Sequence, residues 1–414
     1  MTGNVLVGQS GGPTAVINSS LAGVFKTAKD LGAGKVYGML YGIQGLLEEK
    51  YIDLGEKLHS ELEIELLKRT PSSFLGSCRY KLPEYDLNTE IYERLFDIFN
   101  KLNIQYFFYI GGNDSMDTIK KLSDYGMAHQ SEIRFIGVPK TIDNDLEITD
   151  HTPGYGSAAK FIGTTTKEII RDSLVYDQKN VTIIEIMGRN VGWLTGAAAL
   201  SAGVDCKGPD MIYLPETDFS LEDFLERTAR LQNHKKSLVI AISEGIHLKD
   251  GRYVCELTED TKYVDGFGHT MLNGAASILA QRLAREIGCK TRAIELNTLQ
   301  RCASHMASLV DIKEAFLAGA AGVRAAVEGK SGEMIILKRI SGGLKDCNSI
   351  YECTTDTFDI HKIANMEKRV PLEWIDLTNH KVTKEFIDYA RPLIGDELTP
   401  IMVEGLPRHI EYVI

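Results

Sequence analysis

The stretch "IQYFFYIGGNDSMDTIKKLSDYG", residues 104–126, contains the pattern that decides the fold of this chain. Its apolar, aromatic first half predicts a buried β-strand, and its amphipathic second half predicts a helix. At the junction, Gly111 and Gly112 allow backbone N–H groups to approach a negatively charged ligand closely. Asp114, in the first turn of the predicted helix, is either an ordinary helix cap or a residue that acts on that ligand.

Strand-like and helix-like segments alternate along most of the chain. The strand-like runs include "NVLVG" (4–8), "KVYGML" (35–40), "IRFIGV" (133–138), "VTIIEIMG" (181–188), "SLVIAISEG" (237–245), "TRAIEL" (291–296) and "EMIILKRI" (333–340). This alternation predicts mostly parallel sheets covered by helices on both faces, the doubly wound α/β class. Ligands in such folds bind outside the carboxyl ends of the strands.

The length suggests more than one domain. We expect an N-terminal α/β domain over residues 1–150 and a second α/β domain over residues 151–340, with a binding cleft between them. The segment 341–414 has few glycines after about residue 355 and reads as peripheral helices and loops that can return to the first domain.

The composition restricts the class of partner. The chain of 414 residues is 43% hydrophobic and carries a net charge of −11, from 46 basic and 57 acidic residues. An acidic protein is unsuited to nucleic acid or an anionic membrane, although local basic side chains can still bind an anionic small molecule.

The cysteines and the start of the chain indicate a compartment. Seven cysteines lack any CxxC spacing, which predicts reduced thiols in a cytosolic protein. The first residues lack the pattern of a signal peptide, and no window is apolar enough for a membrane span. We therefore expect a soluble, cytoplasmic protein.

A second glycine turn, "GQSGGPTAVIN" at residues 8–18, repeats the plan of strand, turn and helix. Ser10, Gly11 and Gly12 form the turn, and the helix is expected to begin near Thr14. The free N–H groups of that helix would face a ligand. A tight turn without a ligand explains the motif by itself, but two such turns in one chain can face the same phosphate-binding cleft.

The loop "PKTIDNDL", residues 139–146, is unusually rich in reactive side chains. Asp143 and Asp145 can divide two tasks, one accepting a proton and the other holding Mg²⁺. Lys140 can neutralise phosphate oxygens, and Thr141 adds a hydroxyl. A solvated acidic turn is the alternative, but the density of functional groups favours a site.

Further candidates follow strands of the second half. In "EIMGRNVGWLTG", residues 185–196, an arginine at a strand end can stabilise charge on a transferring phosphoryl group. An ordinary role at a helix start or in a surface ion pair is the alternative for each arginine. The candidates are Met187, Gly188 and Arg189, Glu244 in "ISEG", and Arg292 and Arg301 in "KTRAIELNTLQR".

In this order, the motifs "SGGPTAVIN", "GGNDS", "PKTIDND", "MGR", "SEG" and "TRAIEL…LQR" resemble the phosphofructokinase family, over about residues 4–340. The resemblance implies two α/β domains flanking a cleft, Mg²⁺, fructose 6-phosphate, and phosphoryl transfer to the 1-hydroxyl of the sugar. It also implies an oligomer, either a homodimer or a homotetramer, in which a neighbouring subunit contributes to sugar-phosphate binding.

The resemblance assigns roles residue by residue. Asp143 is the implied general base, and Thr141, Lys140 and Arg189 complete the catalytic set. The implied phosphoryl-donor residues are Ser10, Gly11, Gly12, Arg79, Gly112, Asp114, Ser115 and Lys140. The implied sugar-phosphate residues are Thr141, Asp143, Met187, Gly188, Arg189, Glu244, Arg292 and Arg301, and the implied Mg²⁺ ligands are Asp114 and Asp145, with Asn113 as an additional candidate.

The pair Asp114 and Lys140 is similar to the pyrophosphate-dependent branch of the family. Members that use ATP have glycine at both positions. A carboxylate at position 114 would repel the α-phosphate of ATP, and a lysine at position 140 would bind a shorter donor. The resemblance therefore implies pyrophosphate as donor and a reaction that runs in both directions.

Three positions depart from the family pattern. Asn113 stands where many relatives have a metal-associated aspartate, Thr298 replaces a larger ring-bearing residue, and Asn180 replaces an arginine of bacterial relatives. These differences leave a seven-carbon sugar phosphate, sedoheptulose 7-phosphate, as an additional substrate. An ATP-dependent sugar-phosphate kinase and a non-catalytic regulatory subunit are the alternative functions.

Overall fold

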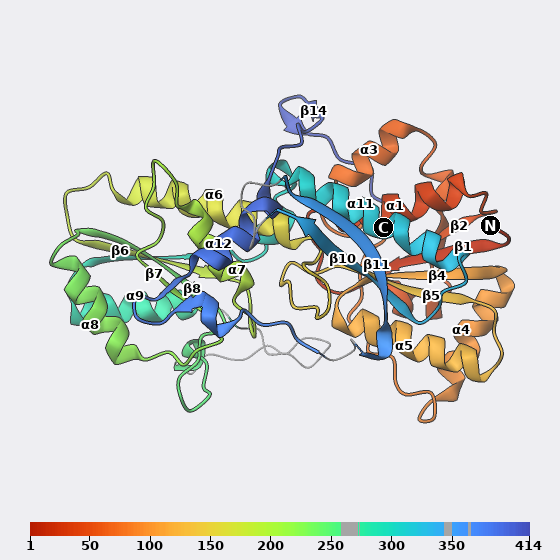
Figure 1. The fold of residues 1–414 in the computed structure, drawn as a ribbon, viewed down its shortest axis with the longest axis horizontal. Helices are drawn as coiled ribbons and strands as arrows, with labels where there is room; N and C mark the ends of the chain where they lie inside the picture. The colour runs from red at the N-terminus through yellow and green to blue at the C-terminus, as the bar shows by residue number, and fades with distance from the viewer. Residues whose placement is uncertain (258–271, 273, 343–349, 363–365) are drawn as a thin grey trace.

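The computed structural model describes residues 1–257, 272, 274–342, 350–362 and 366–414. Within these residues the main strands form a seven-stranded and a four-stranded sheet, which lie at opposite ends of the molecule (Figure 1). The predicted α/β class with mostly parallel sheets is confirmed, since antiparallel pairing in the two sheets is limited to β2 with β3 and β10 with β11.

The larger sheet has the strand order β11-β10-β5-β4-β1-β2-β3. Its strands are β1 (Asn4–Gln9), β2 (Val36–Met39), β3 (Tyr51–Asp53), β4 (Ile104–Gly111), β5 (Arg134–Pro139), β10 (Glu333–Ser341) and β11 (Glu352–Asp359). Its helices are α1 (Ile17–Asp30), α2 (Gly42–Leu47), α3 (Glu61–Arg69), α4 (Thr89–Lys101), α5 (Asn113–Ala128) and α11 (Leu309–Val327).

Both faces of the larger sheet are buried because successive side chains of a strand point to opposite faces. Phe108 and Ile110 of β4 pack in one core with residues of α1, α3 and α11. Phe107 and Tyr109, from the same strand, pack in a second core with residues of α4 and α5. The continuous apolar run at residues 104–110 is therefore a central strand covered on both sides.

The smaller sheet is parallel throughout, with the order β7-β8-β6-β9. Its strands are β6 (Asn180–Ile186), β7 (Met211–Tyr213), β8 (Ser237–Ser243) and β9 (Lys290–Glu295). The helices of this half are α6 (Tyr155–Ser173), α7 (Trp193–Gly196), α8 (Leu221–Gln232), α9 (Ala275–Glu286) and α10 (Leu299–Cys302).

The last part of the chain contacts both halves. The strands β10 and β11 complete the larger sheet, whereas α12 (Lys384–Ala390) packs in the core that contains α6 and α7. The tail also contains β12 (Ile375–Asp376), β13 (Lys381–Val382), β14 (Met402–Val403) and β15 (Leu406–Pro407). Finally, the Ile410 N–H donates to Thr70 Oγ1 at the larger sheet's end of the molecule (3.0 Å). The domain boundaries near residues 150 and 340 stay a prediction.

One predicted helix start is wrong. Helix α1 begins at Ile17, and residues 11–16 form the preceding turn. The Thr14 hydroxyl accepts a hydrogen bond from the Val16 N–H (3.2 Å), which supports the turn in place of a first helical turn.

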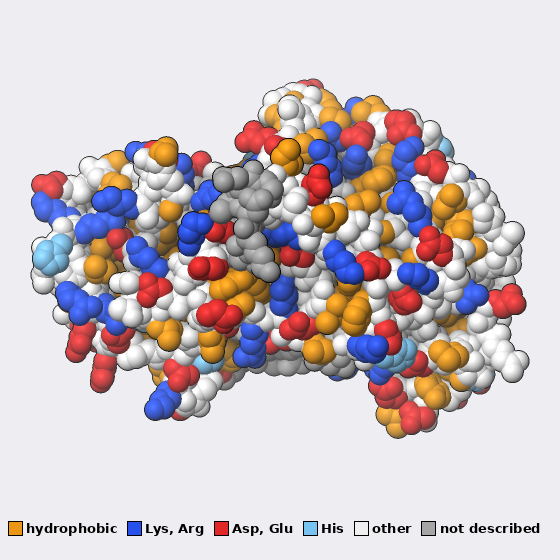
Figure 2. Space-filling model, viewed as in Figure 1, with side chains coloured by type: hydrophobic (Ala, Val, Ile, Leu, Met, Phe, Trp, Pro, Cys, Tyr) orange, Lys and Arg blue, Asp and Glu red, His pale blue; other side chains and the backbone are white. Residues whose placement is uncertain are grey.

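Two further observations concern the whole chain. Among the described residues, no helix combines the length and apolarity that a membrane span requires, and no disulfide joins the cysteines; Cys347 lies outside these residues. Figure 2 shows basic and acidic side chains interspersed over the visible face, so the described part of that face carries no extended field of one sign.

Candidate active site

The two glycine turns and the loop after β5 meet at the carboxyl ends of neighbouring strands. The Lys140 N–H donates to Gly111 O (3.0 Å), and the Ser10 N–H donates to Ile110 O (3.0 Å). Helix α5 begins directly after Gly112, its N-cap residue. Asp114 is the second residue of this helix, so the reading of Asp114 as an ordinary cap is wrong.

Lys140 is the buried cation of the site, with 3% of its surface exposed. Its ammonium group donates to Gly12 O (2.7 Å), and a Cβ on Gly11 would lie 3.3 Å from the Lys140 Nζ. Burial lowers the pKa of Lys140 to about 8, although Asp143 and Asp145 favour its charged form. Lys140 therefore joins the first glycine turn to the acidic loop and is largely protonated at neutral pH.

The two carboxylates of the loop have different surroundings. Desolvation raises the pKa of Asp143, against the opposing effects of Lys140, Thr141, Arg301 and Arg189. The Thr141 hydroxyl lies 3.4 Å from Asp143 Oδ2. Desolvation, and then the charge of Asp143, raises the pKa of Asp145 to about 7. Basic groups thus partly offset the effect of burial on the Asp143 pKa.

Three arginines approach this loop from separate segments. A Cβ on Gly12 would lie 3.2 Å from Arg301 Nη1, which places Arg301 of α10 beside the first glycine turn. Partial desolvation, followed by repulsion from Arg301 and Arg189, lowers the pKa of Arg79, and Asp114 opposes that shift. This concentration of positive charge suits a ligand with several phosphate groups.

The smaller sheet contributes the opposite wall of the site. The Gly188 N–H donates to Glu244 Oε1 (3.2 Å), and the Met187 N–H donates to Gln300 Oε1 (3.2 Å). Desolvation raises the pKa of Glu244 to about 7, and Asp143 adds to that rise while Arg189 opposes it. The carboxyl ends of β5, β6 and β8 therefore face one shared site.

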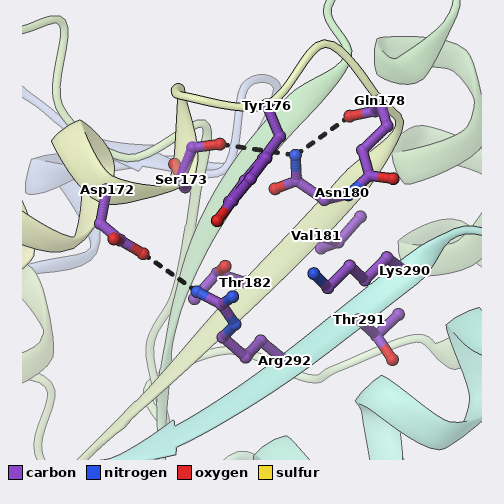
Figure 3. Close-up of a pocket in the computed structure, with 10 residues that line it drawn as sticks. All are labelled: Asp172, Ser173, Tyr176, Gln178, Asn180, Val181, Thr182, Lys290, Thr291 and Arg292. Carbon is purple, nitrogen blue, oxygen red and sulfur yellow. Dashed lines mark hydrogen bonds and ion pairs between the residues drawn. The ribbon is translucent and has the colours of Figure 1, made fainter.

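Arg292 lies apart from the other predicted residues. Figure 3 shows it in a surface pocket with Asn180 and Lys290, its guanidinium pointing toward Asp172. Arg292 Nη1 lies 3.0 Å from Asp172 Oδ2, and both side chains are substantially exposed. In this single chain, Arg292 and Arg301 do not converge on one phosphate position.

Two further predicted residues, Ser10 and Ser115, lie at the glycine turns. The Ser10 hydroxyl donates to Cys78 O at 3.5 Å, and Ser115 Oγ lies against Gly111, where an added Cβ would be 1.8 Å from it. Gln300, whose Oε1 accepts from the Met187 N–H, was not among the residues predicted for the site. Its position next to Arg301 in the "LQR" motif was the available signal.

The residues Asn113 and Asp145 fit a Mg²⁺ ion. Asn113 Nδ2 donates to Asp145 Oδ2 at 3.3 Å, which joins α5 to the acidic loop. Among the described residues, Asn113 Oδ1 and Asp145 Oδ1 are buried and accept no hydrogen bond. Two such oxygens, one of them a carboxylate oxygen, match the hard ligands that Mg²⁺ prefers.

Two facing α/β sheets with a cation-rich, acid-containing site at their strand ends define an enzyme that transfers phosphoryl groups. The family model for phosphofructokinase matches residues 4–325, and the chain belongs to the phosphofructokinase family.

Several members of the phosphofructokinase family are similar to this chain over nearly its whole length. The chain is 37% identical to the pyrophosphate–fructose 6-phosphate 1-phosphotransferase of Halomonas elongata, over 98% of this chain and 95% of that protein. The enzyme of the same name from Methylococcus capsulatus is also 37% identical, over 98% and 95%. A crystal structure of a pyrophosphate-dependent phosphofructokinase from Marinobacter aquaeolei superposes with a TM-score of 0.86 at 36% identity, covering 99% of this chain and 96% of that one.

Proposed function

We propose that this protein transfers a phosphoryl group from pyrophosphate to the 1-hydroxyl of fructose 6-phosphate, giving fructose 1,6-bisphosphate and phosphate, and that the reaction runs in both directions. The position of Lys140 carries the proposal. Its buried ammonium group contacts Gly12 O of the first glycine turn, close enough to Asp143 for their charges to interact, and would there meet the charge of a compact donor.

Donor selection rests on a repulsive and an attractive element. Asp114 lies in the first turn of α5, where its charge acts on Arg79. A nucleotide with an additional phosphate would meet the Asp114 carboxylate, whereas pyrophosphate ends before it. Lys140, Arg79 and the N–H groups of the glycine turns attract the remaining negative charge.

In the proposed reaction, Asp143 accepts the proton of the sugar 1-hydroxyl as the hydroxyl oxygen forms a bond to the nearer phosphorus of pyrophosphate. The bond from that phosphorus to the bridging oxygen breaks, and phosphate leaves. Lys140 and Arg189 offset the charge on the phosphoryl oxygens during the transfer. Thr141 lies beside Asp143 and orients its carboxylate. Glu244 and Arg301 are the proposed contacts to the sugar phosphate.

Asp145 and Asn113 are the proposed Mg²⁺ ligands, and Asp114 follows Asn113 at the start of α5. When bound there, Mg²⁺ neutralises negative charge on the phosphates. An asparagine in place of a second carboxylate lowers the negative charge of the ligand set, so we expect the phosphates to provide much of the affinity for the ion.

The direct test measures fructose 1,6-bisphosphate formation with Mg²⁺ and fructose 6-phosphate, comparing pyrophosphate with ATP as donor. Turnover with pyrophosphate and little with ATP is the expected result. Turnover with ATP alone would contradict the roles of Asp114 and Lys140 while leaving that of Asp143 standing. Sedoheptulose 7-phosphate, tested as acceptor in the same assay, would show whether the departures at Asn180 and Thr298 widen the acceptor range.

Arg292 and Asn180 motivate a proposal about assembly. We infer that Arg292 completes the sugar-phosphate site of a neighbouring subunit, because it is exposed and lies in a pocket apart from Asp143. Mixing subunits tests this: Arg292→Ala and Asp143→Ser proteins should each be nearly inactive, and after co-refolding the mixture should regain a substantial fraction of wild-type activity. A mixture that stays as inactive as its components would contradict a shared site.

A cytoplasmic location also stays a proposal.

A further inference from the structure

We propose that Lys368 and Tyr389, in the last part of the chain, are positioning residues that hold the catalytic loop, residues 140–152, in its active geometry. The kinetic part of this inference rests on the proposed function. The catalytic loop consists of bends and irregular backbone, apart from an isolated bridge between Thr141 and Gly154. Its shape therefore depends on side chains that reach it from elsewhere.

Asn144 is the first point at which the loop is held. It lies between the proposed base Asp143 and the proposed metal ligand Asp145, is fully buried, and has a left-handed backbone conformation (φ 58°). Its side-chain Nδ2 donates to the Tyr389 hydroxyl (2.8 Å), and its Oδ1 accepts from the Thr152 N–H (3.0 Å). A buried amide with both ends paired fixes the direction of its two neighbours.

The far end of the loop is held by the same hydroxyl. Tyr389 Oη donates to Asp150 O (2.6 Å) while it accepts from Asn144. The Lys368 ammonium group also donates to Asp150 O, to Thr149 O (3.2 Å) and to the Tyr389 hydroxyl (3.3 Å). Two side chains from the last part of the chain therefore connect both ends of the loop.

The Asp150 side chain is occupied by other partners. Asp150 Oδ1 accepts from His151 Nδ1 (2.8 Å) and from Arg339 Nη2 (3.0 Å). These partners compensate the Asp150 carboxylate charge. The Asp150 backbone carbonyl then takes the hydrogen bonds from Lys368 and Tyr389, and a loss of these donors would leave buried carbonyl groups unsatisfied.

The backbone of Lys368 adds a second connection, across the site. Its N–H donates to Asp145 O (2.9 Å), and its carbonyl accepts from Trp193 Nε1 (2.9 Å). Trp193 starts α7, a few residues after Arg189, and the Lys368 ammonium lies 5.1 Å from the Trp193 ring centroid. Lys368 thus sets the separation between the loop that carries Asp143 and the loop that carries Arg189.

A tyrosine-to-phenylalanine pair tests the proposal. In Tyr389→Phe the ring remains packed and only the hydroxyl is lost. Tyr92→Phe is the matched control, because Tyr92 is fully buried in the core that contains α4 and its hydroxyl donates to Pro83 O, outside the network of Lys368, Trp193 and the catalytic loop. We expect Tyr389→Phe to lower kcat by about 10–100-fold with KM values within about two-fold, because the reacting groups lose alignment while substrate contacts remain.

Hydrogen exchange of the backbone amides supplies a readout that does not depend on turnover. Peptides that cover residues 140–152 should exchange faster in Tyr389→Phe than in the wild type, and no faster in Tyr92→Phe. Exchange that stays at the wild-type rate in this loop, or that rises equally throughout both variants, would overturn the proposal. A wild-type protein without pyrophosphate turnover would instead contradict the proposed function, and the exchange comparison would still decide the role of Tyr389.

Lys368→Met supplies a second variant, because it keeps an unbranched side chain of similar length and removes the three donors. Its kcat should fall as in Tyr389→Phe. The double variant should lose less than the product of the single losses, because both groups hold the same Asp150 carbonyl. Fully multiplicative losses would show that the two side chains act independently, which would contradict a single clamp on the loop.

Discussion

Replacing Asp143 by serine should lower kcat with pyrophosphate and fructose 6-phosphate by about 10²–10⁴-fold, the contribution expected of a general base. Asp143 is the carboxylate that Lys140, Arg189 and Arg301 surround, and Thr141 contacts it directly. Serine removes the proton acceptor without adding bulk. The protein should still bind fructose 6-phosphate, measured by calorimetry, because the contacts from Glu244 and the arginines remain.

A control separates the loss of the base from the loss of any buried carboxylate. Asp117 of α5 is also buried, and its carboxylate pairs at 2.7 Å with Lys121, whose other partners are Glu84 and Leu82 O. Asp117→Asn should leave kcat within about two-fold of the wild type while removing a comparable charge. Unchanged turnover in Asp143→Ser would eliminate Asp143 as the base, and loss of sugar binding in that variant would assign it a binding role.

The double replacement Asp114→Gly and Lys140→Gly should exchange the phosphoryl donor. We expect kcat/KM for pyrophosphate to fall by about 10²–10³-fold, because a preorganised cation at the transferring phosphoryl group is lost. Measurable turnover with ATP should appear, since the carboxylate that repels the nucleotide and the ammonium group that fills its space are both gone. Each single variant should gain less ATP activity than the double variant.

Two further measurements test whether the positive charge of Lys140 is responsible for the use of pyrophosphate. They are the pH dependence of the wild type and that of Lys140→Arg. Burial lowers the pKa of Lys140 to about 8, so its positive charge is present below that pH and is lost above it. The wild-type kcat/KM for pyrophosphate should therefore fall as the pH rises through about 8. The remaining activity of Lys140→Arg should not show this fall in kcat/KM, the alkaline limb, because arginine stays charged. An identical limb in Lys140→Arg would show that another group titrates.

The strand, glycine turn and helix units were predictable because their signals are local. The apolar run before Gly111, the turn after Gly8 and the acidic loop after β5 each read correctly from neighbouring residues. The parallel arrangement then brought these turns to one edge of the sheet. The resemblance added the proposed donor-selecting role of Asp114 and Lys140, which composition and spacing alone could not supply.

Other parts of the site had no local signal. Arg292 and Arg301 lie in one short motif, yet the structure places them in separate regions because one belongs to β9 and the other to α10 beyond it. By contrast, the start of α1 at Ile17 depends on a local hydrogen bond from the Val16 N–H to Thr14 Oγ1, which competes with helix formation. Lys368 and Tyr389 follow no recognisable motif at all.

The sequence by itself determined the class of sheet, the positions of the two glycine turns and the position of the acidic loop that carries the proposed base. These features depend on side-chain periodicity and turn geometry over a few residues. Only the tertiary structure decided which distant segments complete the site: Arg301 beside Gly12, and Lys368 and Tyr389 on the catalytic loop. Such contacts join residues more than two hundred positions apart, where burial and hydrogen-bond pairing in the folded core select the partner, and no local pattern encodes that choice.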